Sequence, residues 1–187
     1  MSITRRSTMM GFVSVTGLAL ALAEPAAAAS ATELIRESDA ALANLYAKQP
    51  RAKQLGARAQ AILVFPRILK AGFIVGAQGG NGVLFQGGLP TSFYNISAAS
   101  YGLQAGVQSF SYALFFITPS SLAYLKNSYG WAIGAGPSVV VLDKGIAKSV
   151  TTSTLTQDVY AIPFNQAGLM AGLGLEGSKI TAISVGP

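Results

Sequence analysis

Six basic side chains lie close together in the chain, and no acidic residue between Asp39 and Asp143 balances them. Each lysine or arginine near an anionic lipid surface contributes about 1 kcal/mol to binding. Nucleic-acid phosphates attract the same side chains, and a solvated basic face that keeps the protein soluble is a third interpretation. We favour a lipid surface, do not expect nucleic acid as a partner, and take as candidate lipid-binding residues Lys48, Arg51, Lys53, Arg58, Arg67 and Lys70.

The usual catalytic constellations are missing from the sequence. The chain has no Cys and no His, which excludes disulfides, thiolate zinc sites, Cys nucleophiles, His metal ligands and a Ser-His-Asp triad. After Asp39 the acidic residues are Asp143, Asp158 and Glu176. Two of them could meet in space, as glycosidases require, but no motif surrounds them and we interpret them as turn or surface charges. We therefore predict a protein that is not an enzyme and uses no metal or cofactor. A hydrolase is the minor alternative.

The composition indicates a folded domain with an unusually uncharged body. Of the 187 residues, 51% are hydrophobic and 11% are charged, against about 25% charged in a soluble domain. Residues 71–125 carry no formal charge. The high apolar content argues against global disorder, so the basic residues precede a body that must be held together by packing.

The first 29 residues have the pattern of an export signal. Arg5 and Arg6 supply a positive start, Gly11–Ala23 is apolar, and Ala27–Ala29 offers an A-x-A cleavage site. The apolar run is too short to cross a bilayer of about 30 Å, so a retained anchor is the lesser alternative. The Arg pair resembles the start of twin-arginine signals, with general secretion as the alternative route. We expect an exported domain over residues 30–187, periplasmic or peripheral on an envelope membrane.

Two helices are predicted at the front of this domain. Ser30 with Glu33 forms the capping-box pattern at a helix start. Pro50 ends this helix and opens a second one, since proline suits the first helical position. Residues 51–60 form an amphipathic, cationic pattern typical of interfacial helices. Its apolar stripe is mostly alanine, so packing on a sheet is the expected use of that stripe.

From Ala61 onward the apolar period changes to two, which indicates strands. The residues Gly79–Gly82 between two of them predict a hairpin turn, and Pro66 is expected to end the first strand. Thr118 and Pro119 predict a short helix near 119–129. The predicted strands are Ala61–Phe65, Ala71–Gln78, Val83–Gln86, Ser100–Gln108, Phe110–Ile117, Trp131–Leu142, Val159–Phe164, Gly168–Leu175 and Lys179–Val185.

Glycines recur in pairs at strand spacing, which is unusual because glycine weakens a strand. Either the sheet bends tightly at these positions or another layer approaches closely. We predict an α+β fold: a mainly antiparallel, strongly curved, Gly-rich sheet or barrel of about seven or eight strands, with the amphipathic helices in front and the short helix inserted. The pairs are Gly72/Gly76, Gly102/Gly106, Gly134/Gly136 and Gly172/Gly174.

Several blocks, in the right order, resemble the SYLF domain family. They are Ala61-Ile-Leu-Val-Phe-Pro66, Lys70-Ala-Gly72, Gly79 to Leu84, Tyr101-Gly-Leu-Gln-Ala-Gly-Val-Gln108, Gly130-Trp131 and Gly168 to Ser178. The resemblance runs from about Leu55 to Ile183 and implies a lipid-binding module without enzyme activity. Eukaryotic members bind phosphoinositide membranes, partly through an N-terminal amphipathic helix, and some bind actin. Bacterial members are exported.

Charge pattern and resemblance together lead to one hypothesis. We expect an exported, non-enzymatic protein that associates with anionic phospholipid at an envelope membrane through its basic N-terminal region. The alternative is a structural or protein-interaction component of the cell envelope, whose basic face meets an acidic protein partner.

Overall fold

The computed structural model describes residues 30–72, 75–101, 106–142, 156–168, 175 and 177–186. The predicted export signal over residues 1–29 lies outside this part of the chain, as do Asp143 and Glu176.

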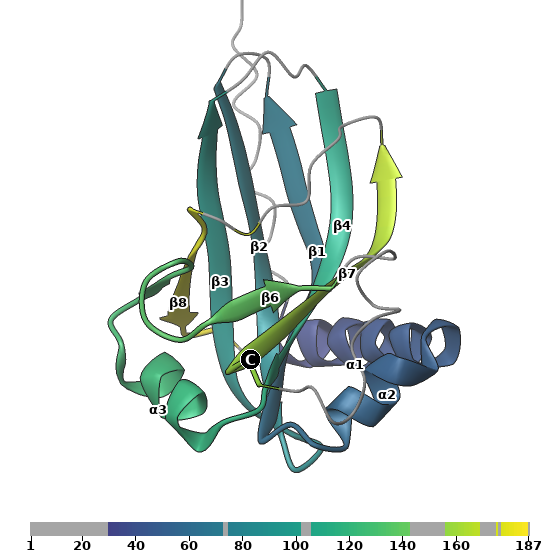
Figure 1. Ribbon diagram of the computed structural model, residues 1–187. Coiled ribbons are helices and arrows are strands. Elements are labelled where there is room, and N and C mark those ends of the chain that lie inside the picture. The colour runs from purple at the N-terminus through teal and green to yellow at the C-terminus, as the bar shows by residue number, and fades with distance from the viewer. Residues whose placement is uncertain are drawn as a thin grey trace, which may run out of the picture.

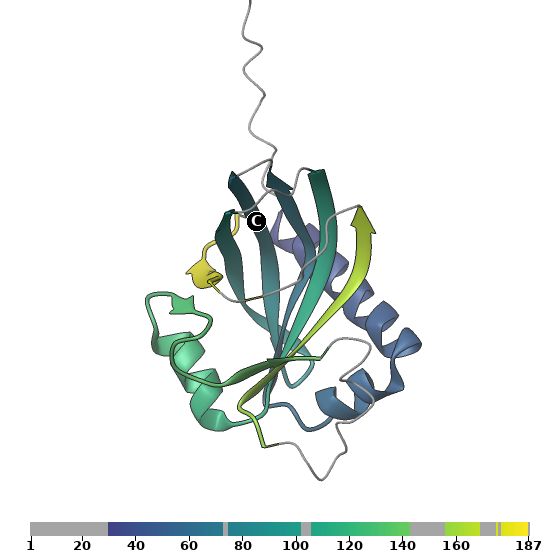
Figure 2. The same ribbon diagram turned by 45° about the horizontal axis from the view of Figure 1, so that its top comes forward.

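One eight-stranded sheet dominates the molecule, in the order β5-β8-β3-β2-β1-β4-β7-β6. All neighbouring strands pair antiparallel except β6 and β7, which are parallel. The sheet curls into a half-barrel (Figures 1 and 2), which confirms the predicted fold class. The strands are β1 (Ala61–Gly72), β2 (Val75–Gln86), β3 (Leu89–Tyr101), β4 (Gly106–Phe116), β5 (Trp131–Ala132), β6 (Val139–Val141), β7 (Val159–Gly168) and β8 (Lys179–Ile183).

Three helices accompany the sheet in the described part of the chain, and each begins at a residue that the sequence predicts. The Ser30 hydroxyl accepts a hydrogen bond from the Glu33 amide at the start of α1 (Ala31–Lys48). Pro50 opens α2 (Pro50–Gly56). Thr118 caps α3 (Pro119–Asn127), which confirms the short inserted helix. The Ala31 amide also donates to the Gly186 carbonyl at 3.0 Å, which ties the start of α1 to the segment that follows β8.

Two apolar cores lie on opposite faces of the sheet. Side chains alternate between faces along a strand, so Leu63 and Phe65 enter one core while Val64 enters the other. The inner core fills the hollow of the half-barrel, where α3 and the fully buried Trp131 close it. The outer core lies under α1 and α2, which cross the outside of the sheet (Figure 2).

A bulge in β1 is the source of the tight bend. The pairing register of β1 shifts between Val64 and Leu69 against β2, and between Phe65 and Ile68 against β4. There the β1 backbone approaches β2 so closely that a methyl group on Gly82 would lie 2.5 Å from the Val64 carbonyl oxygen. Gly80 is equally crowded, by the Arg67 carbonyl. Proline is tolerated at a bulge, so β1 continues through Pro66 to Gly72. The prediction that Pro66 ends the strand is wrong.

Other glycines serve different purposes from the predicted one-face pairs. Gly72 lies directly opposite both Gly76 and Gly106, so these residues form a row across three strands rather than a face of one. Gly134 and Gly136 have positive φ angles in the turn after β5. The predicted partners Gly102, Gly172 and Gly174 lie outside the described residues.

Several predicted strand limits are wrong. Gly79–Gly82 is the middle of β2, paired on both sides, and not a hairpin turn. The segment 100–108 is divided between the end of β3 and the start of β4, and the segment 131–142 forms two short strands. Strand β3 was missed because Ser, Asn and Ala dilute its apolar alternation. Most of the predicted strand 168–175 lies outside the described residues.

We predict that Gly82→Ala lowers the free energy of unfolding by about 1–3 kcal/mol, because the added methyl group overpacks a rigid backbone contact. Gly79→Ala is the matched control in the same strand, since its methyl group would lie an ordinary 3.7 Å from the Ile96 carbonyl oxygen. Urea unfolding measures both variants. Equal losses for the two variants would contradict the close-approach explanation.

Asp158 joins three segments at the end of the sheet where α3 begins. Its carboxylate accepts hydrogen bonds from the Thr118 hydroxyl at 3.0 Å, and from the Ser138 amide and hydroxyl at 3.1 and 3.0 Å. The Ser138 backbone amide, followed by the two hydroxyls, lowers the pKa of Asp158 from its usual value. Asp158 thus acts in the fold as a structural acid, in agreement with the predicted turn charge.

A depressed pKa in the folded state makes the ionised Asp158 stabilising above the unfolded-state pKa of about 4. This contribution is lost as the pH falls through the lower folded-state value. We therefore expect Asp158→Asn to be less stable than the wild type at pH 6, with the difference shrinking below about pH 4. Urea unfolding at several pH values tests this, and a pH-independent difference would contradict it.

Candidate functional site

Four of the six predicted basic residues lie together at one end of the molecule. Lys48 occupies the last turn of α1, Arg51 and Lys53 lie in α2, and Arg58 follows α2 directly. All four side chains are exposed. We call Lys48, Arg51, Lys53 and Arg58 the basic cluster.

The basic cluster faces outward because the other side of α2 is anchored in the outer core. Ala52 and Leu55 are only 1% and 6% exposed and pack in that core. Pro50 lets α2 begin one residue after α1 ends, with Gln49 between them. This confirms that the apolar stripe packs within the fold, so α2 presents Arg51 and Lys53 to a partner, and not Ala52 or Leu55.

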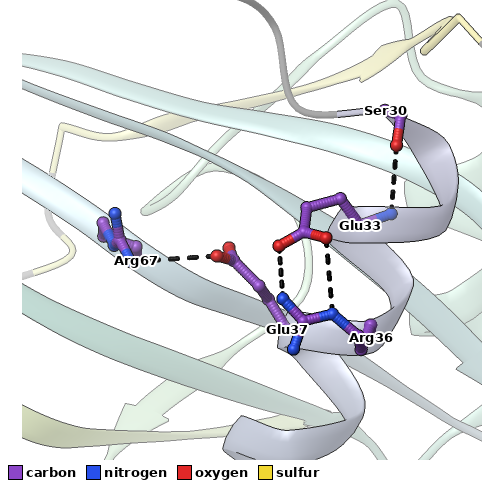
Figure 3. Close-up of polar contacts among 5 residues, drawn as sticks. All are labelled: Ser30, Glu33, Arg36, Glu37 and Arg67. Carbon is purple, nitrogen blue, oxygen red and sulfur yellow. Dashed lines mark hydrogen bonds and ion pairs between the residues drawn. The ribbon is translucent and has the colours of Figure 1, made fainter.

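Polar contacts link helix α1 to the sheet in addition to packing. Glu37 reaches across to Arg67 of β1 at 3.8 Å, while Glu33 and Arg36 form an ion pair within the helix itself (Figure 3). Farther along α1, the Asn44 side chain donates to Asn165 of β7 at 3.1 Å. These contacts fix the helix that carries Lys48.

Asn165 links α1 to the bulges of the sheet. It is the one described non-glycine residue with a positive φ, 52°. Its side-chain amide donates to the Ser111 hydroxyl at 3.4 Å, and that hydroxyl donates to the Pro66 carbonyl at the β1 bulge, at 2.7 Å. The position of the helix therefore depends on the same bulge that bends the sheet.

Arg67 and Lys70 lie apart from the basic cluster. Arg67 is exposed at the bulge and pairs with Glu37. Lys70 lies nine residues into β1, about 30 Å along the strand from Ala61 at about 3.3 Å per residue. It is half-buried between its cross-strand neighbours Gln78 and Gln108, on the face that Ile68 shares with the inner core. Proximity in sequence therefore grouped two residues that the fold separates.

Two of the four cations in the basic cluster are available to an anion. No acidic residue occurs between Asp39 and Asp143, so the basic cluster has no acidic neighbour along the chain. The ammonium groups of Lys48 and Lys53 have no hydrogen-bond or ion-pair partner in the described part of the chain, whereas Arg51 and Arg58 each have an interaction within the fold. Solvated lysines that face outward are available to a negatively charged surface.

The turn between β2 and β3 is a neighbouring feature that the sequence analysis did not single out. Because Ile62 of β1 pairs with Phe85 of β2, this turn lies at the sheet end where α2 leads into β1 (Figure 1). Its glycines, Gly87 and Gly88, follow an apolar strand and are a hairpin signal that could have revealed it.

Beside this turn, an open groove of about 750 Å³ is lined by β2, β3, α3 and the segment around β8. The Lys126 ammonium at its wall donates to the Gln86 side chain at 2.7 Å. The same end of the molecule thus carries a further cation on α3.

No family model and no curated protein matches this chain. Among the helices of the described residues, none has the length and apolarity that crossing a membrane requires.

We predict that the basic cluster is dispensable for folding. Lys53→Gln is expected to change the free energy of unfolding by less than about 0.5 kcal/mol, as surface substitutions usually do. Leu55→Ala removes buried side-chain atoms two residues away and is expected to cost about 2–5 kcal/mol. Urea unfolding compares the two, and a large loss in Lys53→Gln would mean that the charge stabilises the fold.

Proposed function

We propose that the protein binds anionic phospholipid peripherally, without catalysis, through the basic cluster. The observation that carries the proposal is the outward placement of Lys48, Arg51, Lys53 and Arg58 at the junction of α1 and α2, where Ala52 and Leu55 anchor the other side of α2 in the outer core. Arg67 and Lys70 are not part of this contact, because they lie at other places on the sheet. The pattern of residues 1–29 supports an envelope membrane as the target.

Binding of this kind is electrostatic and reversible. At about 1 kcal/mol for each cation near the lipid surface, four cations supply about 4 kcal/mol, or roughly a thousandfold preference for anionic over neutral membranes. Salt screens such contacts, since the Debye length is about 8 Å at physiological ionic strength. The buried apolar stripe of α2 adds nothing to the affinity.

The resemblance to the SYLF domain is independent support. We propose that the chain belongs to this family, whose eukaryotic members bind phosphoinositide membranes. The resemblance rests mainly on glycine and apolar blocks of the sheet, while the basic cluster precedes all of them. The function is therefore argued from the cluster, and the family supplies only the class of ligand.

Vesicle flotation tests the proposal. We expect the protein to float with anionic vesicles and not with neutral ones. Binding should be lost when salt rises from about 0.01 M to about 1 M, because the Debye length falls from about 30 to about 3 Å. The double variant Lys48→Glu/Lys53→Glu should bind at least about 30-fold more weakly, since two contributions of about 1 kcal/mol disappear.

The matched control carries one charge reversal at an exposed cation elsewhere, Lys179→Glu, and is compared with Lys53→Glu alone. Equal weakening in these two single variants would mean that net charge, and not the basic cluster, drives binding. Salt-independent flotation, or none, would overturn the proposal. A stoichiometric acidic protein recovered without lipid would favour the protein-interaction alternative.

A further inference from the structure

Three large aliphatic side chains are strongly exposed among the described residues, and only one of them lies near the basic cluster. Leu89 is 69% exposed, Val107 is 60% exposed and Leu69 is 51% exposed. Leu69 and Val107 lie on β1 and β4 toward the far end of the sheet, where Gly72 pairs with Gly106. Leu89 is the first residue of β3 and directly follows the two-glycine turn from β2, at the sheet end where α2 leads into β1 (Figure 1).

The turn holds Leu89 outward in a defined geometry. Gly87 and Gly88 have φ angles of 59° and 80°, which glycine adopts readily. Nothing lies within 4 Å of where their side chains would be, so the tip is open. Leu89 pairs with Gln86 across the turn, and the Thr91 hydroxyl donates to the Leu84 carbonyl at 3.1 Å. Because Leu89 is already paired with Gln86, the backbone loses little further conformational entropy when a partner buries the leucine side chain.

The charges around this tip suit an anionic lipid surface. Lys126 contacts Gln86, the residue just before the two glycines, and the basic cluster lies at the same end of the sheet. Asp158 also belongs to this end, where β7 begins, but its carboxylate is occupied by Thr118 and Ser138. An anionic membrane presents negatively charged headgroups with acyl chains beneath them. The cations suit the headgroups, and the exposed leucine suits the acyl chains.

We infer that Leu89 is an apolar anchor, which inserts below the headgroups while the basic cluster and Lys126 contact them. The inference rests on the proposed lipid function and adds a contact that is independent of salt. The occupant of the tip is thus the boundary between headgroups and acyl chains of an anionic bilayer. Burial of the exposed part of one leucine corresponds to about a 5- to 30-fold gain in membrane affinity.

Flotation with anionic vesicles tests the anchor by comparing Leu89→Ser with Val107→Ser. Both variants remove a similarly exposed aliphatic side chain from a strand, and neither position is buried in a core. We expect Leu89→Ser to bind about 5- to 30-fold more weakly and Val107→Ser to bind like the wild type. Equal affinities in Leu89→Ser and wild type would overturn the anchor.

Depth of insertion is measured by tryptophan quenching with lipids brominated on their acyl chains. The native Trp131 is fully buried in the inner core and gives the unquenched background. We expect Leu89→Trp to be quenched on anionic vesicles and Val107→Trp to stay at background. Absence of quenching in vesicle-bound Leu89→Trp would overturn the anchor even if affinities differed.

These outcomes separate the anchor from the proposed function. Salt-sensitive vesicle binding that Leu89→Ser leaves intact would overturn the anchor alone. Salt-insensitive binding that Leu89→Ser abolishes would support the anchor and overturn the role of the basic cluster. A wild-type protein that binds neither anionic nor neutral vesicles would overturn both.

Discussion

At the Pro66–Arg67 bulge the β1 backbone approaches β2 closely, and the pairing register of β1 shifts against both of its neighbours. Only a residue without a side chain fits at Gly80 and Gly82, and in return the sheet bends sharply enough to enclose an inner core. The bend leaves an outer face, where Val64 and its neighbours pack against α1 and α2. The same bulge offers the Pro66 carbonyl that is linked to α1 through Ser111 and Asn165.

The division of apolar residues between two cores decides what is left for the surface. The apolar stripe of α2 packs in the outer core, where Ala52 and Leu55 are buried. The cations of α2 therefore lie on its exposed side. The uncharged central part of the chain supplies buried side chains to both cores from the second half of β2 and from β4, whereas most of β3 is exposed or half-buried. Among the described residues, five exposed cations lie at one end, beside the turn that precedes the exposed Leu89; they are Lys48, Arg51, Lys53, Arg58 and Lys126. Charge and apolar surface are neighbours because the antiparallel pairing of β1, β2 and β3 brings them to one end.

Local chemistry was predictable from the sequence, and contacts between distant segments were not. Ser30, Pro50 and Thr118 mark helix starts because capping depends on residues a few positions away. The structural role of the segment Gly79–Gly82 depends instead on β1, which lies against it. A run of three glycines in four residues is also typical of a turn, which is why a turn was predicted there. Arg67 and Lys70 are close to the basic cluster in sequence but not in the fold. Arg67 lies at the bulge of β1, and Lys70 lies farther along the same strand. The position of Leu89 at the same end as α2 could not be predicted from the sequence, because it depends on the pairing of β1, β2 and β3.

The hydrogen bond from the Ala31 amide to the Gly186 carbonyl brings the first helix of the domain beside the segment that follows its last strand. These two positions are close enough to be joined, so the elements could follow one another in a different order along the chain and keep the same arrangement in space. A short linker between these two positions, with new termini opened at Gly87 and Gly88, gives a circular permutant that keeps every strand neighbour. In such a permutant the turn that carries Leu89 becomes a pair of chain ends, while α1, α2 and the bulge retain their surroundings.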